Sequence, residues 1–581
     1  MTAVTGLLRR ALGLPAPRTP RVRRTPDVAV PMPDGVVLRH DHYRPAGVAR
    51  GPVVLVRSPY GRASWVGTVF GRLVAERGYQ AVVQSVRGTS GGDRHPSEGE
   101  FSPFDEADDG VATVRWLVAQ PWCDGRVGTL GPSYLGLTQW ALAPDSLPAL
   151  QAMGTLVTAS QFRDQTYPGG SFSLDNALSW ASLIRDQAAG PLAALRRRLP
   201  GRLDDRLERA FVEVPLAGAD RTATGGDVGF WHDWLRESEP DSAYWAKRSA
   251  AGRVREVAEG GVDVSMAGGW QDMFLPWQLE DYAALRAGGA RPRLVIGPWV
   301  HTSPGGMAAG LREGLATFDR RFGAHPAGPG GEEALAATTA DAPVLVELSG
   351  GGGRRALADW PPPSPAEPPA VLYLRADHTL ADEPPDAGAS GPEVRWAGTT
   401  VHYDPHDPTP AVGGPILSGL SGPRRQDALE ARGDVAVFTG PVLAADLVAL
   451  GPARAVVYLR APDAHLDVFV RVCDVDPSGR SVNVTDGLRR VVPGPDGSVR
   501  GPGVLDGDDG SITVEVDLWA LGHRFAAGHR VRVQVSGGAH PRFARHPGTG
   551  AALGEATELV ARPREILHDR THPSRVQLAR P

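Results

Sequence analysis

The sequence predicts an α/β domain interrupted by a helical insertion and followed by an antiparallel β domain. Short apolar, β-rich runs alternate with helix-like segments up to about residue 157, as in a parallel, doubly wound sheet. Residues 158–256 then become helix-like and rich in Trp and Arg, before strand-like runs resume at 262–270 and 291–299. Beyond about residue 365, short strands recur with turns between them and without a long amphipathic helix, which is typical of an antiparallel sandwich.

The length of the chain requires several hydrophobic cores. It has 581 residues, whereas one core rarely grows beyond roughly 250–300 residues. Hydrophobic residues make up 41% of the chain, enough to bury such cores and to exclude disorder over most of the length. We expect a discontinuous α/β domain at 27–157 and 257–365, a helical cap at 158–256, a β domain at 366–581, and a basic, disordered arm at 1–26. One or two short amphipathic helical turns at 6–14 are the alternative for this arm.

Charge and cysteine content exclude several classes of protein. The net charge of −5 gives no reason to expect nucleic acid as a partner. Two cysteines, Cys123 and Cys473, exclude a disulfide framework and favour a reducing compartment. No apolar run reaches the ~18–20 residues that span a bilayer, and the first 26 residues lack the apolar core of a signal peptide. We therefore expect a cytoplasmic protein without a membrane span, and the oligomeric state stays open.

The predicted elements follow in order along the α/β part. Residues 27–45 hold two alternating runs around Pro33-Asp34-Gly35, which indicates a β-hairpin. Apolar runs at 53–57, 79–86, 126–131 and 150–156 predict strands, and the segments 69–78 and 108–120 between them predict helices. Gly- and Pro-rich stretches around 303–332 and 350–369 interrupt the pattern before the β domain.

The most distinctive local feature is RVGTLGPSYLGLTQWALA at 126–143. A β-rich run leads into Gly131-Pro132-Ser133-Tyr134, and an apolar, helix-like segment follows. A serine on such a strand-to-helix turn is held above the sheet, as in a nucleophile elbow. The helix that follows points its positive N-terminal end at the same place. By itself the pattern is weak, because Leu135 stands where the common motif has glycine and Gly136 comes one position later.

Two further residues complete a possible triad in the order that serine hydrolases of this type require. Asp272 follows the strand-like run VDVSMAGGW, and His301 follows RPRLVIGPW. Both lie at the carboxyl ends of strands, where open α/β sheets build their sites. Taken singly, Asp272 could cap a helix and His301 could be an ordinary loop residue. The order Ser, Asp, His favours a nucleophile, an orienting carboxylate and a base.

Ordered sequence blocks carry a family resemblance from about residue 27 to beyond 550. They include PMPDGVVLRHDHYRP, RSPYG, VRGTSGG, QPWCDGRVGTLGPSYLG, GGWQDMF, GPWVH, YDPHDPTPAVGG and HRVRVQVSGGAHPRFARHPGTG. The chain is similar to the CocE/NonD family of serine hydrolases, which includes ester hydrolases and relatives of Xaa-Pro dipeptidyl-peptidases. The resemblance implies an α/β-hydrolase core with an inserted helical cap domain and a C-terminal β jelly-roll domain.

The same resemblance implies roles for single residues. Ser133 matches the family's nucleophile, Asp272 the residue that orients the base, and His301 the general base. Tyr60 in RSPYG matches the tyrosine whose phenol forms the oxyanion hole together with the N–H of Tyr134. No metal or organic cofactor is implied. One departure is Ser85, in a position where many members of the family have aspartate.

The expected function is hydrolysis of ester or amide bonds of small acyl substrates through an acyl-enzyme. Xaa-Pro dipeptidyl-peptidase activity is an alternative, and it would require a carboxylate that meets the substrate's ammonium group. A catalytically idle, carbohydrate-binding protein is an alternative of another class. Five aromatic residues could wall an acyl pocket, although a packed cap would use the same residues: Trp180, Trp231, Trp270, Phe274 and Trp277.

Overall fold

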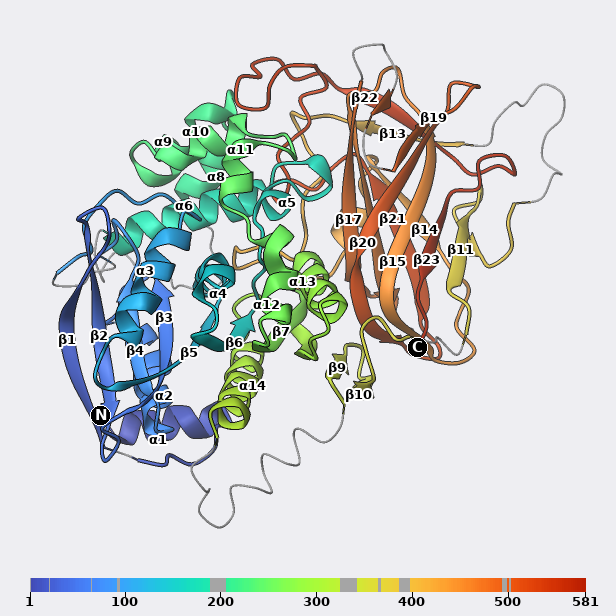
Figure 1. The fold of residues 1–581 in the computed structure, drawn as a ribbon. Helices are drawn as coiled ribbons and strands as arrows, with labels where there is room; N and C mark the ends of the chain where they lie inside the picture. The colour runs from blue at the N-terminus through green and yellow to red at the C-terminus, as the bar shows by residue number, and fades with distance from the viewer. Residues whose placement is uncertain are drawn as a thin grey trace, which may run out of the picture.

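The structure is a computed structural model in which an α/β part, a helical cap and a β sandwich lie against one another (Figure 1). It describes residues 2–19, 21–63, 65–90, 95–188, 205–323, 342–363, 367–385, 398–493, 499–500 and 503–581.

The α/β part is built on one ten-stranded sheet in the order β1-β2-β4-β3-β5-β6-β7-β8-β9-β10. Its strands are β1 (Val22–Pro31), β2 (Val37–Pro45), β3 (Gly51–Ser58), β4 (Gln80–Ser85), β5 (Cys123–Pro132), β6 (Leu150–Leu156), β7 (Asp263–Gln271), β8 (Arg293–Val300), β9 (Val344–Leu348) and β10 (Gly353–Leu357). The strands from β4 to β9 are parallel, and the predicted hairpin joins β1 to β2. The chain runs outward from β3 to β4 and returns to β5, so a topological switch point lies between β3 and β5, where open α/β sheets bind ligands.

Helices connect these strands and cover the sheet (Figure 1). They include α2 (Leu73–Glu76), α3 (Ala107–Val118), α4 (Tyr134–Leu142), α12 (Val254–Glu259), α13 (Leu275–Ala287) and α14 (Pro304–Phe322). Helix α14 lies in the Gly- and Pro-rich stretch around 303–332, where the sequence had indicated a break in the regular pattern. A Cβ on Gly310 would come within 2.2 Å of Leu156, so these glycines bring the helix close to the sheet.

The cap is inserted between β6 and β7 and lies over the carboxyl ends of the parallel strands (Figure 1). Its described helices are α5 (Arg163–Thr166), α6 (Leu174–Ala188), α8 (Asp205–Phe211), α9 (Ala219–Thr224), α10 (Gly229–Arg236) and α11 (Ala243–Lys247). Aromatic side chains hold it together, among them the buried Phe172, Trp231, Trp234 and Trp245.

A buried carboxyl ties the start of the cap to the α/β core. Asp281 of α13 accepts hydrogen bonds from the backbone N–H of Ser160 at 2.8 Å and from the Ser160 hydroxyl. Burial raises the pKa of the Asp281 carboxyl to about 8. Because an unfolded aspartate has a pKa near 3.9, folding favours the protonated form between these two values.

Replacing this carboxyl by an amide tests the consequence for stability. The folded state binds the Asp281 proton more tightly, so this group's contribution to the free energy of unfolding falls as pH rises from about 4 to about 8. Asn cannot ionise and still offers one acceptor and one donor to Ser160. We therefore expect Asp281→Asn to match wild type near pH 5 and to be more stable at pH 8, measured by denaturant unfolding at both pH values. An equal effect at both pH values would contradict this account.

The C-terminal domain consists of two antiparallel sheets with a shared core, which agrees with the predicted jelly roll. One sheet has the order β12-β11-β23-β15-β20-β19 with β22 and β13 alongside, and the other has β14-β21-β16-β17-β18. The strands are β11 (Ala370–Leu374), β12 (Leu380–Ala381), β13 (Gly398–Tyr403), β14 (Val435–Thr439), β15 (Leu447–Arg460), β16 (Leu466–Val475), β17 (Ser481–Pro493), β18 (Val499–Arg500), β19 (Val504–Asp506), β20 (Ile512–Phe525), β21 (Arg530–Ser536), β22 (Arg562–Leu567) and β23 (Arg575–Leu578). Their inward residues form one apolar cluster, including Val470, Val514 and Phe525.

The expectation of a disordered arm at 1–26 was wrong for the residues that the structure describes. Helix α1 (Thr2–Ala11) docks on α2, where the Thr5 hydroxyl and the Arg9 guanidinium both contact the buried carboxylate of Glu76. Leu12 is buried after the helix, and β1 already begins at Val22. Leu8, Leu12 and Leu14 pack on the core beside these polar contacts, and the polar and apolar contacts together hold the helix in place. None of the described helices is both long and apolar enough to cross a membrane.

Candidate active site

Ser133 lies on the turn between β5 and α4 in a strained backbone conformation. Its φ and ψ are 55° and −125°, a combination that costs free energy for a residue with a Cβ. Glycines clear the space around it: a Cβ on Gly131 would lie 2.5 Å from Leu135, and one on Gly136 would lie 2.2 Å from Thr158. The Thr158 hydroxyl donates to the carbonyl of Ser133 at 2.8 Å and helps to hold the turn. The hydroxyl of Ser133 is thereby raised above the sheet.

The structure brings Ser133, Asp272 and His301 together. His301 Nε2 lies 3.0 Å from Ser133 Oγ, and His301 Nδ1 lies 2.6 Å from Asp272 Oδ2. The Asp272 side chain is fully buried, and its other oxygen accepts the backbone N–H of Phe274 at 2.9 Å. Because a carboxylate only accepts, Nδ1 carries the imidazole proton and Nε2 presents its lone pair to the serine hydroxyl. This arrangement can remove the proton of Ser133.

Two hydrogen-bond donors lie close to Ser133, one in the loop after β3 and one at the start of α4. The N–H of Tyr134, the first of α4, has no acceptor among the described residues. Tyr60, in the loop after β3, makes a side-chain hydrogen bond with Ser133 and accepts the indole N–H of Trp180 at 3.2 Å. Burial raises the pKa of the Tyr60 phenol to about 12, so it keeps its proton and can donate it. These two groups are therefore the candidates for the predicted oxyanion hole.

A buried network that the sequence analysis did not identify supports Tyr134. The Tyr134 phenol donates to Glu106 at 2.7 Å and accepts the backbone N–H of Phe104 at 3.0 Å. Glu106 forms a buried ion pair with Arg57 of β3 at 2.9 Å. Burial raises the pKa of the Glu106 carboxyl, and the neighbouring Arg57 opposes this shift. The network joins the strand before Tyr60 to the turn that holds Tyr134. In the sequence, Glu106 belongs to the acidic run DEADD at 105–109, which indicates a helix start and not a buried ion pair.

A cavity of about 730 Å³ opens in front of the triad. Of the five aromatic residues expected in an acyl pocket, Trp180 and Phe274 line it. The other three do not, because each packs elsewhere. Trp231 is fully buried against Phe172 in the cap, Trp270 donates its N–H to Glu347 O at 2.7 Å beside Trp360, and Trp277 packs against Trp519 of the β domain.

Other residues supply the rest of the wall. The apolar and aromatic ones include Trp65, Phe104, Val157, Phe162, Leu183, Trp234, Met273, Met307 and Leu417. Leu417 comes from the β domain and is held by Asn176 of the cap, whose side-chain oxygen accepts its N–H at 2.9 Å. None of the described residues that line the cavity is Asp, Glu, Lys or Arg. Folding brings these residues together from distant parts of the chain, and no local pattern marks them.

Ser85, which stands where many members of the family have aspartate, contacts a buried arginine. The Ser85 hydroxyl accepts a hydrogen bond from the buried guanidinium of Arg62 at 3.1 Å. Arg62 also pairs with Asp41 at 3.2 Å and with Asp27. Carboxylates of β1 and β2 therefore neutralise this arginine without an acidic residue at position 85.

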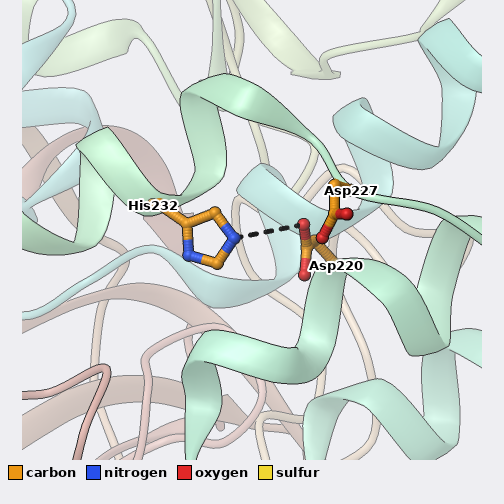
Figure 2. Close-up of side chains that lie close together, drawn as sticks. All are labelled: Asp220, Asp227 and His232. Atoms are coloured by element: carbon orange, nitrogen blue, oxygen red, sulfur yellow. Dashed lines mark ion pairs between the residues drawn. The ribbon is translucent and has the colours of Figure 1, made fainter.

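One cluster of possible metal ligands occurs among the described residues, and Figure 2 shows it in the cap. It consists of Asp220, Asp227 and His232. Asp220 accepts the N–H groups of Arg221 and Val228 at 2.8 Å each, and Asp227 pairs with Arg221 at 2.5 Å. His232 is 3.8 Å from Asp220, and none of the three lines the cavity. These contacts hold the turn between α9 and α10 in place, which accounts for the three residues lying close together.

Two protein-family models match successive parts of the chain. Residues 34–303 match the family model of the X-Pro dipeptidyl-peptidases (S15 family), and residues 336–577 match that of the X-Pro dipeptidyl-peptidase C-terminal non-catalytic domain. Cocaine esterase of Rhodococcus sp. (strain MB1 Bresler) is 29% identical over 95% of this chain and 97% of its own length.

Two solved structures share the fold. An aminopeptidase from a Thaumarchaeota archaeon superposes with a TM-score of 0.77 at 20% identity, and an α-amino acid ester hydrolase superposes with a TM-score of 0.75 at 22% identity. Each comparison covers 96% of both chains. The expected combination of an α/β-hydrolase core and a β-rich C-terminal domain is confirmed.

Proposed function

The chain belongs to the S15 family of X-Pro dipeptidyl-peptidases and related serine hydrolases, and on this premise we propose that it hydrolyses small, uncharged acyl esters through an acyl-enzyme. The observation that carries the proposal is the 3.0 Å contact between Ser133 Oγ and His301 Nε2 at the floor of a cavity with an apolar and aromatic lining. Amides with the same acyl groups are poorer substrates of the same site, because an amine leaves less readily than an alcohol.

The reaction follows from the contacts. His301 Nε2 takes the proton of Ser133 while Oγ forms a bond to the acyl carbon, and the Tyr60 phenol and the Tyr134 N–H stabilise the oxyanion. The imidazolium then gives its proton to the departing oxygen as the ester bond breaks. Water attacks the acyl-enzyme in the same way, with His301 as the base, and releases the acid. Asp272 holds the imidazole tautomer throughout.

The lining of the cavity favours an acyl group without charge. Its polar side chains outside the triad and Tyr60 are neutral, such as Gln165, Asn176 and Gln187. An Xaa-Pro peptide or an α-amino ester would bring an ammonium group into this cavity, where no described carboxylate faces it. Burying a charge without a partner costs several kcal/mol. This cost weighs against the Xaa-Pro alternative for this chain.

A matched pair of substrates tests this preference. The p-nitrophenyl esters of 3-phenylpropionic acid and of phenylalanine differ in one α-ammonium group. We expect kcat/KM to be at least about 100-fold higher for the uncharged ester near pH 6, because the ammonium loses its water without gaining a carboxylate. The difference should narrow toward pH 9, where the α-amino group, with an ordinary pKa of about 7.7–8.0, is deprotonated. A preference for the phenylalanine ester, or activity restricted to Xaa-Pro anilides, would overturn the proposal.

A catalytically idle, carbohydrate-binding protein would not react with a probe for activated serines, whereas a serine hydrolase would. A fluorophosphonate probe reacts with an activated serine and not with an ordinary one, so labelling of wild type separates the two classes. Failure to label would favour the alternative. For the location we propose a reducing compartment such as the cytoplasm, which the buried and unpaired thiols of Cys123 and Cys473 support.

A further inference from the structure

One tryptophan of the cap contacts the side chains of both residues that supply the oxyanion donors. Trp180 of α6 donates its indole N–H to the Tyr60 phenol oxygen at 3.2 Å. Its ring stacks on that of Tyr134, with 5.7 Å between centroids and 12° between planes. We propose that Trp180 is a positioning residue of the oxyanion hole, through which the cap sets the two donors. The inference rests on the proposed function.

The bond from Trp180 decides where the Tyr60 proton points. A phenol has one proton to donate and lone pairs to accept with, whereas an indole N–H can only donate. With the indole on its oxygen, Tyr60 has its own proton left for the oxygen beside Ser133. A donor on the phenol oxygen also polarises its O–H bond, so the phenol becomes a better donor. Trp180 thus supports Tyr60 without touching the reacting atoms.

A stack of aromatic rings fixes the position of this indole. Trp234 lies parallel to Trp180, with 5.9 Å between centroids and 16° between planes, and Phe104 lies 5.9 Å away at 21°. Phe230 of α10 closes another side at 5.4 Å. On the core side, the Tyr134 ring is anchored by its hydrogen bond to Glu106. The stack therefore runs from the cap to the nucleophile turn, and it holds the indole before substrate enters.

Trp180 also lines the cavity, so its role as a wall must be separated from its role as a donor. The variant Trp180→Phe keeps an aromatic ring and removes the N–H. We expect it to lower kcat about 3- to 10-fold, the range for one neutral hydrogen bond, with little change in KM. A residue that acts only as a wall would instead change KM, by an amount that depends on the size of the acyl group.

A double-mutant cycle with Tyr60→Phe gives the decisive readout. If Trp180 acts through the phenol, Trp180→Phe should lower kcat in wild type and have almost no effect in the Tyr60→Phe background. Trp65→Phe is the matched control: Trp65 lines the same cavity, but its ring contact among the described residues is with Phe70 and not with the Trp180 stack, so its effect should be equal in both backgrounds. Equal effects of Trp180→Phe in the two backgrounds would overturn the inference.

Inhibition by phenylboronic acid provides a second measurement. The boronate forms a tetrahedral adduct with a reactive serine and places an oxygen in the oxyanion hole. Its inhibition constant should rise in Trp180→Phe by about the factor by which kcat falls, and an unchanged constant would contradict the inference. A wild-type protein that neither hydrolyses esters nor binds phenylboronic acid would instead refute the proposed function, so the two failures are distinguishable.

Discussion

Ser133→Ala is expected to lower kcat for uncharged p-nitrophenyl esters by about 10⁶-fold, the loss seen when a triad serine is removed alone. Among the described residues, Ser133 Oγ is the hydroxyl that contacts His301 Nε2, so its removal leaves this base without its nucleophile. Alanine tolerates the backbone at this position no worse than serine does, because both carry a Cβ at φ 55°. The unfolding transition should therefore be unchanged. Initial rates over a wide range of enzyme concentration, with circular dichroism to verify folding, measure both quantities.

A second serine provides the control for this substitution. Ser349 Oγ lies 2.8 Å from His523 Nδ1, and His523 Nε2 lies 3.0 Å from Asp474, so the same three residue types meet between the core and the β domain. None of the three lines the cavity, and the Ser349 hydroxyl also contacts Gly522 O at 3.0 Å. We expect Ser349→Ala to keep wild-type kcat. Retained activity in Ser133→Ala together with loss in Ser349→Ala would move the nucleophile to the second cluster.

The fold was predictable where the sequence pattern is periodic and local. The strands from β3 to β8 carry apolar runs between turn residues, and the break after β6 marks the inserted cap. Helix α14 was missed because its glycines lower helix propensity, whereas in the structure they allow close packing on the sheet. The arm was missed for a similar reason: its order depends on Glu76, which lies more than 60 residues from Thr5 and Arg9.

In the candidate site, too, the residues that follow a local pattern were predictable, and those brought together by distant contacts were not. Ser133, Asp272 and His301 follow strands directly, so their positions could be inferred from strand ends and chain order. The wall of the cavity could not, because Phe104, Trp234 and Leu417 come from a core loop, the cap and the β domain. Trp270 and Trp277 are near Asp272 in sequence, but their side chains point into other contacts. Proximity in sequence predicts position along a loop and not the direction of a side chain.

Asp272→Asn is expected to lower kcat about 10⁴-fold while leaving the fold intact. The Asp272 carboxylate accepts two hydrogen bonds, from Phe274 N–H at 2.9 Å and from His301 Nδ1 at 2.6 Å. Asparagine has one acceptor oxygen for these two donors. The backbone N–H of Phe274 cannot change its role, so it keeps the oxygen, and the NH₂ group faces the imidazole. His301 must then accept at Nδ1 and carry its proton on Nε2, where the lone pair for Ser133 is lost.

The loss of kcat in Asp272→Asn should come from the wrong imidazole tautomer and not from a damaged fold. Asp281→Asn is the matched control, since it makes the same change at another buried carboxyl that carries a proton for much of the time near pH 7 and does not line the cavity. We expect that variant to keep wild-type kcat. In Asp272→Asn, KM should change little, because the cavity wall is untouched. A loss of less than about tenfold would contradict the role of Asp272, since the imidazole would then hold its tautomer without the carboxylate.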